Sequence, residues 1–373
     1  MKTVLSMTAA LAGVAFASPA LAAPVTDCPL RDLPFSAQSP LIDVLLSPEA
    51  KAVIEKYAPG RIDRMPPMFA GTKPPTFAAI LSAETATRFT GIDAATVAKI
   101  DAELKALPVT AADRAARCAR YDNEVPALAP AKKGQTRLLV IEKINGFKDV
   151  PSVNAAHAAL AAMAERKGWS ITFTEQAGAF NPKTLAQVDA VVWNNISGDI
   201  LTLSQRKAFQ GFLARGGGFA AMHGSAGDPT YFWDWYPDKL IGARFAGHPM
   251  APQFQEARVI VSTDHPIARA AKLPREWRMK DEWYSFKTSP RAAGAKVIAS
   301  LDEGSYTRKG MMAESLDMGA DHPIAWTNCL GRGRMFYSAI GHMPETYSQP
   351  QALALLEAGV EWAAKDKKAC PAK

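Results

Sequence analysis

The stretch SQRKAFQGFLARGGGFAAMH, residues 204–223, contains the change of pattern that decides the fold. Residues 204–215 have the apolar spacing of a helix, and three consecutive glycines at 216–218 end it. Residues 218–223 are apolar up to His223 and are typical of a buried strand. A helix that leads through a short turn into a buried strand is the repeating unit of an α/β fold with a parallel sheet.

The same alternation of helices and strands extends over residues 136–365. Further helices are predicted at 153–167 and 351–364. Further strands are predicted at 137–144, 170–174, 189–195, 258–262, 296–301, 323–327 and 334–340. This order of elements predicts an α/β domain with a mostly parallel sheet flanked by helices.

The region before this domain has a helical pattern. Ser47 and Pro48 mark the start of one helix, and Asp93 marks the start of another. The expected organisation is a small helical N-terminal module at 24–121, a linker at 122–135, the α/β domain at 136–365 and a tail at 366–373.

Length and composition limit the class of protein. With 373 residues, of which 48% are hydrophobic and 21% charged, the chain can bury a large core, which excludes a disordered chain or a miniature disulfide protein. Lys and Arg number 43 against 36 Asp and Glu, for a formal charge of +7. These basic residues are scattered rather than gathered in one stripe, so nucleic acid is not an expected partner.

The first 22 residues are typical of a secretory signal peptide. Lys2 precedes an apolar run at 4–17, and the small residues around Leu21 suit cleavage by a signal peptidase. A membrane anchor is the alternative, but the run is shorter than the roughly 20 residues that span a bilayer. We therefore expect an exported protein, periplasmic or secreted, with no membrane span after signal cleavage.

Export gives the four cysteines a structural role. In an oxidising compartment, Cys28, Cys118, Cys329 and Cys370 predict two disulfides, for which three pairings exist. We favour Cys28 with Cys118, which would clasp the N-terminal region, and Cys329 with Cys370, which would hold the C-terminal tail. No two of them have the spacing of a zinc knuckle or a redox motif.

His223 is the first candidate functional residue. Ligands of open parallel sheets bind beyond the carboxyl ends of the strands. His223 ends the predicted strand at 218–223 and precedes a polar, glycine-containing turn at 224–228. A buried histidine that is satisfied by the backbone alone is the structural alternative.

Eight short segments of the α/β region form a recognisable set. They are VVWNN at 191–195, GGGFAAMH at 216–223, IGARF at 241–245 with GHP at 247–249, DEWY at 281–284, HPIAW at 322–326, GRGR at 331–334, GH at 341–342 and EWA at 361–363. Together they resemble the ThuA-like (trehalose utilisation) family. The resemblance implies a fold similar to that of class I glutamine amidotransferases, with a flavodoxin-like sheet flanked by helices. It also implies a role in sugar metabolism, with oxidised (3-keto) glycosides as the substrate class.

Glutaminase activity is not expected from the resemblance. That chemistry needs a thiolate on the turn after a strand, with a histidine base nearby. Here the turn reads MHGS at 222–225, and none of the cysteines is close to it in sequence. Ser225 also lacks the G-x-S-x-G surroundings of a nucleophile elbow.

Acid, base and ligand candidates remain on separate loops. Asp281 and Glu282 are adjacent, so on a strand their side chains point to opposite faces and only one enters a shared pocket. We choose Glu282, because Tyr284 would share its face. His342 follows the predicted strand at 334–340.

These residues permit two kinds of chemistry. His223, Glu282 and His342 could bind a divalent metal such as zinc and leave one position open. Without metal, Glu282 could act as a general base beside a carbonyl, with a histidine as general acid. Both possibilities stay open from the sequence.

The remaining candidates would bind the substrate, a small-molecule carbohydrate. Arg244 and His248 could contact hydroxyl or carbonyl groups, and Trp233, within the aromatic run at 231–236, could stack on a sugar ring together with Tyr284. We expect a carbohydrate-processing enzyme that isomerises, eliminates or hydrolyses a glycoside or keto-sugar. The alternative is a non-catalytic sugar-binding or accessory protein.

Overall fold

The computed structural model describes residues 24–311, 313–365 and 370. The predicted signal peptide at 1–22 lies outside the described residues, as does the predicted tail at 366–373 except Cys370. Among the described helices, none combines the length and the apolar character that crossing a membrane requires.

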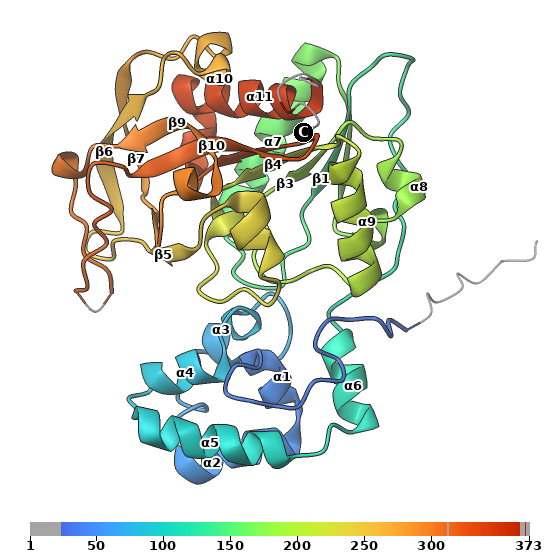
Figure 1. The fold of residues 1–373 in the computed structure, drawn as a ribbon, viewed down its shortest axis with the longest axis vertical. Helices are drawn as coiled ribbons and strands as arrows, with labels where there is room; N and C mark the ends of the chain where they lie inside the picture. Colours follow the sequence, from blue (N-terminus) through green and yellow to red (C-terminus); the bar gives the residue numbers. More distant parts are fainter. Residues whose placement is uncertain (1–23, 312, 366–369, 371–373) are drawn as a thin grey trace, which may run out of the picture.

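The α/β region is built on one sheet of nine strands in the order β2-β1-β3-β4-β11-β10-β9-β6-β7, beside a small sheet of β5 and β8 (Figure 1). The strands are β1 (Arg137–Ile141), β2 (Ser170–Thr174), β3 (Ala190–Trp193), β4 (Gly218–Met222), β5 (Phe245–Gly247), β6 (Phe254–Val261), β7 (Glu276–Glu282), β8 (Ser285–Phe286), β9 (Lys296–Leu301), β10 (Pro323–Leu330) and β11 (Gly333–Ser338).

The sheet has two halves of different character. From β2 to β11 all neighbouring strands are parallel, in the order of a flavodoxin-like fold. From β11 to β7 all neighbours are antiparallel. The predicted α/β class is therefore confirmed, and β6, β9 and β10 of the antiparallel extension match the strands predicted at 258–262, 296–301 and 323–327. The sequence did not predict β7, although its residues alternate between exposed and buried as a half-covered strand should.

Helices cover both faces of the parallel half. They are α7 (Val150–Lys167), α8 (Pro182–Leu185), α9 (Leu203–Ala214) and α11 (Pro350–Lys365), and the short α10 (Pro266–Ala270), between β6 and β7, packs against α11. On one face Phe209 of α9 packs edge-on against Phe219 of β4, with 5.4 Å between ring centroids. On the other face, Arg334 of β11 donates from Nε to the Ala363 carbonyl of α11 at 2.8 Å.

The N-terminal region is helical and lies below the α/β region in the view of Figure 1. Its helices are α1 (Leu41–Leu46), α2 (Pro48–Tyr57), α3 (Pro67–Ala70), α4 (Ala83–Phe89), α5 (Ala94–Ala106) and α6 (Ala111–Cys118). The two expected helix starts are present, because Ser47 accepts from the backbone of α2 and Asp93 from that of α5. These helices enclose an apolar core of their own.

Covalent and polar contacts connect the parts of the chain. Both expected disulfides are confirmed: the Cα atoms lie 5.3 Å apart in Cys28–Cys118 and 5.6 Å apart in Cys329–Cys370. The Tyr121 hydroxyl donates to the Asp199 carboxylate of the α/β region at 3.0 Å. Residues 122–135 contain no helix or strand and lead directly into β1.

Candidate functional site

Three strand ends bring the main candidate residues to one edge of the sheet. His223 directly follows β4, and His342 lies in the loop after β11, which is parallel to β4. Glu282 is the last residue of β7. Because four antiparallel steps separate β7 from β11, the two strands point the same way. The predicted edge, at the carboxyl ends of the strands, therefore carries all three side chains.

The backbone at His223 is strained. Its φ is +31°, in the region that residues other than glycine adopt only at a cost. The ring Nδ1 lies 2.7 Å from the Ala339 carbonyl, which can only accept, so Nδ1 carries the hydrogen. In the neutral ring, Nε2 is then free of hydrogen and available as a ligand or acceptor.

Asp281 and Glu282 diverge as expected for neighbours on a strand. The Asp281 carboxylate accepts from the backbone N–H groups of Gly341, at 2.8 Å, and His342, at 3.1 Å. It also accepts from the Thr346 hydroxyl at 2.9 Å. Asp281 thus fixes the loop that carries His342, while Glu282 points to the opposite side.

The Glu282 side chain meets both histidines. His342 Nδ1 lies 2.9 Å from Glu282 Oε2, and His223 Nε2 lies 3.3 Å from the same oxygen. The two ring nitrogens are 3.0 Å apart. The side chains of His223 and Glu282 are only 4% and 2% exposed, whereas that of His342 is 12% exposed, so the cluster is open on the side of His342.

The donor set fits a divalent metal ion. In a tetrahedral zinc site with bonds of about 2.0–2.1 Å, ligand atoms lie about 3.3 Å from one another. The three separations in the cluster, 2.9, 3.0 and 3.3 Å, are close to that value before any adjustment. Two imidazoles and one carboxylate from three separate strand ends also form a donor set that zinc uses when one position is left for water or substrate.

The surroundings of Glu282 favour the ionised form of its side chain. Burial by itself raises the pKa of Glu282, but hydrogen bonds from His223 and His342 and the charges of His223 and His248 outweigh burial and hold that pKa well below its usual range. Burial lowers the pKa of His342, and the bond to Glu282 outweighs it, so the net shift is upward. Glu282 is therefore a good ligand and a weak base.

His248 and Tyr284, predicted to bind substrate, lie beside the cluster. His248 Nδ1 is 3.2 Å from Glu282 Oε1 and 3.0 Å from the Pro249 carbonyl. The Tyr284 ring packs on that of His223, with 4.1 Å between centroids. Both thus contact residues of the cluster, and their part in substrate binding stays a prediction.

Two further residues were missed by sequence reasoning. Gln253 donates from Nε2 to Glu282 Oε1, and Asp149 Oδ2 lies 3.8 Å from His342 Nε2. Asp149 follows the first parallel strand and precedes α7, which is a position where a ligand-facing residue is expected. No sequence signal marks Gln253.

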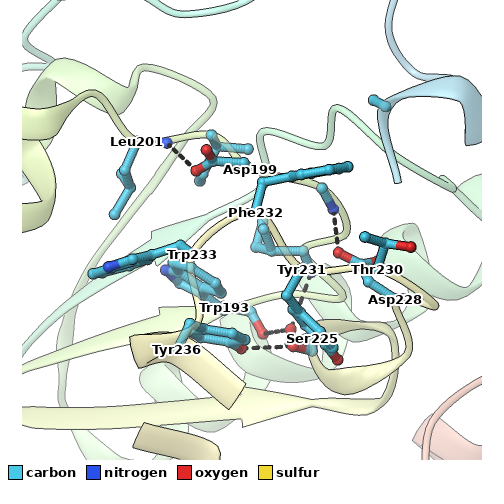
Figure 2. A pocket seen from close by; sticks show the side chains of 14 residues that line it. Trp193, Asp199, Leu201, Ser225, Asp228, Thr230, Tyr231, Phe232, Trp233 and Tyr236 are labelled. Atoms are coloured by element: carbon cyan, nitrogen blue, oxygen red, sulfur yellow. Dashed lines mark hydrogen bonds between the residues drawn. The ribbon is translucent and has the colours of Figure 1, made fainter. Parts of the chain in front are cut away.

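The aromatic run at 231–236 lies at a different pocket, shown in Figure 2. Trp233 and Tyr236 line it together with Trp193 of β3 and with Asp228. The cavity of about 30 Å³ has room for about two water molecules and is too small for a sugar ring. The expected stacking of Trp233 on substrate is thus not supported, because its ring packs on Trp235 instead, with 4.9 Å between centroids.

The guanidinium of Arg244 is engaged by two carboxylates. It pairs with Asp234 at 2.7 Å and with Asp238 at 2.6 Å. Within the described chain, no contact joins it to the three cluster residues. Both acids lie in the segment just before Arg244, and this local spacing was a signal for an ion pair rather than for a free substrate-binding group.

A comparison with protein families adds an independent observation. Residues 137–363 match the model of a family described as "ThuA: Trehalose utilisation". This range contains β1, β11 and all three cluster residues. A search of curated proteins found no match to the chain.

Solved structures give similar results. A ThuA-like protein from Bacteroides uniformis has 23% sequence identity and a TM-score of 0.54, over 63% of this chain and 94% of that one. One from Parabacteroides merdae has 17% identity and a TM-score of 0.46, over 62% and 91% of the two chains. The glutaminase domain of the Trypanosoma brucei protein CTPS has 11% identity and a TM-score of 0.39, over 62% and 94%. Because its identity is only 23%, the similarity to the Bacteroides uniformis protein shows a shared fold alone.

Proposed function

The chain belongs to the ThuA (trehalose utilisation) family, and from this premise we propose that it is an exported enzyme that processes a keto-sugar or keto-glycoside. Family membership suggests a protein of carbohydrate utilisation. Two disulfides support export, because such bonds persist in oxidising compartments. The reaction and the substrate class are the proposal.

One observation carries the proposal, namely the convergence of His223 Nε2, Glu282 Oε2 and His342 Nδ1 within 3.3 Å of one another. These atoms would hold a divalent cation, with zinc as the first candidate. When bound, such a cation draws electron density from a carbonyl oxygen of the substrate and so acidifies the neighbouring C–H bond.

In this proposal, His248 moves that proton. Its Nδ1–H can donate to Glu282 or to the Pro249 carbonyl, which leaves Nε2 without a hydrogen. Nε2 takes the proton from the carbon beside the carbonyl, and the electron pair of the C–H bond moves toward the carbonyl oxygen. Return of the proton to the former carbonyl carbon, with transfer of the hydroxyl proton from the adjacent oxygen to the former carbonyl oxygen, isomerises the sugar. Departure of a leaving group with its electron pair, followed by addition of water, is the alternative outcome.

Other chemistries fit this chain less well. All four cysteines are in disulfides, so no free thiol is available as a glutaminase nucleophile. A metal-free mechanism with Glu282 as base requires proton uptake by a carboxylate whose pKa is held low. A non-catalytic sugar-binding role needs no such cluster of convergent ligand atoms.

Two measurements test the proposal on the mature protein. Metal analysis after purification without chelator should find about one divalent ion per chain. Incubation in deuterated water with a panel of keto-glycosides and unmodified glycosides should give deuterium incorporation or new products with the keto forms only. A metal content near zero that added zinc does not change would overturn the metal site. Sugar binding without any exchange or product would identify an accessory protein instead.

A further inference from the structure

A row of aromatic rings leads from the N-terminal helices to His342. Phe69 of α3 stacks on Phe77, with 4.7 Å between centroids. The Phe77 ring lies 5.1 Å from that of Phe147, in the loop between β1 and α7. Phe147 in turn lies 6.0 Å from the His342 ring. Residues far apart in the sequence thus form one continuous apolar row that ends at the candidate site.

The N-terminal helices are held closely against the loop of Phe147. The Thr76 N–H donates to the Asn145 carbonyl at 3.0 Å. A Cβ added at Gly146 would lie 2.6 Å from Cγ2 of Ile80 and 2.3 Å from the Ser197 hydroxyl. Only glycine therefore permits this approach, and the row is a fixed feature of the fold rather than a loose contact.

The row is only partly covered. Phe69, Phe77 and Phe147 are all half-buried, unlike the rings in the core of the α/β region. Met68, at 48% exposed, and Val150, at 51% exposed, are near neighbours of the row in sequence and are also open to solvent. Partly exposed rings beside a polar cluster are typical of sites that bind a ring with an apolar face.

We infer that this row contacts the second ring of a two-ring glycoside whose first ring lies at the cluster of His223, Glu282 and His342. The inference rests on the proposed function and deepens it. It assigns the N-terminal helices a part of the substrate site, with Phe77 as a specificity-determining residue. The substrate class is then a glycoside with a sugar or aryl aglycone, rather than a free monosaccharide.

The test compares substrates with and without a second ring, using the full mature protein. The probes are a methyl keto-glucoside, a keto-disaccharide and an aryl keto-glucoside. We expect Phe77→Ala to raise KM about tenfold for the two-ring probe that matches the natural aglycone and to leave kcat for that probe unchanged. The KM and kcat for the methyl keto-glucoside should both stay unchanged. Whichever of the keto-disaccharide and the aryl keto-glucoside shows the larger increase in KM identifies the class of aglycone. Phe77→Leu keeps the apolar bulk but removes the aromatic face, so it should show the same selective loss for the two-ring probe to a smaller extent, which covers the case in which Phe77→Ala does not fold.

Phe89→Ala is the matched control, since Phe89 belongs to the same set of helices and is 57% exposed. It should leave all three substrates unchanged. Equal changes for one-ring and two-ring probes in both Phe77 variants would indicate a structural role and overturn the inference, as would no change at all. Binding of the unmodified sugars, measured by calorimetry, separates the proposed reaction from the proposed contact between the aromatic row and the second ring. If the wild type turns over none of the probes but Phe77→Leu still weakens two-ring binding selectively, the proposed reaction fails and this inference stands.

Discussion

The His223–Glu282–His342 cluster and the aromatic pocket of Figure 2 both include residues of the turn after β4, but the rest of each is assembled differently. The cluster draws its side chains from three strand ends far apart in sequence, and their polar atoms converge on one point. Most of the pocket comes from short stretches around 196–201 and 225–236, and its rings pack on each other. The run of aromatic residues along the chain therefore marks a packed region, whereas the fold topology brings together the polar atoms of the candidate site.

The largest expected effect comes from removing one of the convergent ligands. Glu282→Gln replaces the charged oxygen with an amide, so zinc affinity should fall at least about a hundredfold and keto-glycoside turnover should be lost. Metal titration and a turnover assay measure both. Trp233→Ala, in the aromatic pocket, is the control and should keep the metal and the activity. Retention of full zinc affinity by Glu282→Gln would remove the contrast between the two regions.

A smaller effect is expected at Asp281, which is not a ligand itself but binds the loop that carries His342. Asp281→Asn weakens the bonds to the backbone of Gly341 and His342, so the free energy of unfolding should fall by about 1–3 kcal/mol. Zinc affinity should fall by about 10- to 100-fold, because His342 is less well held. Urea unfolding of metal-free protein and zinc titration are the measurements, with the exposed Asp264→Asn as control. Lower stability with unchanged zinc affinity would show that Asp281 supports the fold alone.

A third effect concerns pH and the aromatic pocket. Burial raises the pKa of Asp228 to about 7, against the hydrogen bonds from Ser197 and Gly198 that lower it. Between about pH 4 and pH 7 the folded state then binds more protons than the unfolded state, so stability falls as pH rises and levels off above. Asp228→Asn mimics the protonated form and lacks this slope. The stability gap between the variant and the wild type should widen by up to about 1.4 kcal/mol per pH unit in that window. Parallel pH profiles in urea unfolding would refute the shift.

The sequence predicted the parallel half of the sheet well, because its apolar runs alternate with helices at regular intervals. It also placed His223 and His342 at strand ends, where ligands bind. The contact of Glu282 with the two histidines could be predicted only in part. The alternation of side chains along a strand showed that Glu282 and Asp281 point to opposite faces. Nothing in the local sequence showed that β7 ends beside the loop after β11. Gln253 reaches Glu282 through packing between distant segments, which leaves no pattern in the chain.

The disulfide between Cys28 and Cys118, 90 residues apart, encloses all six N-terminal helices in a covalent ring. A single cut by a protease anywhere within that ring would not release a fragment, since both pieces stay attached to the α/β region until the bond is reduced. In an oxidising compartment, where reductants are scarce, the helices that carry Phe69 and Phe77 would thus remain part of one molecule after such a cut. Gel mobility of nicked protein would reveal the cut only after reduction.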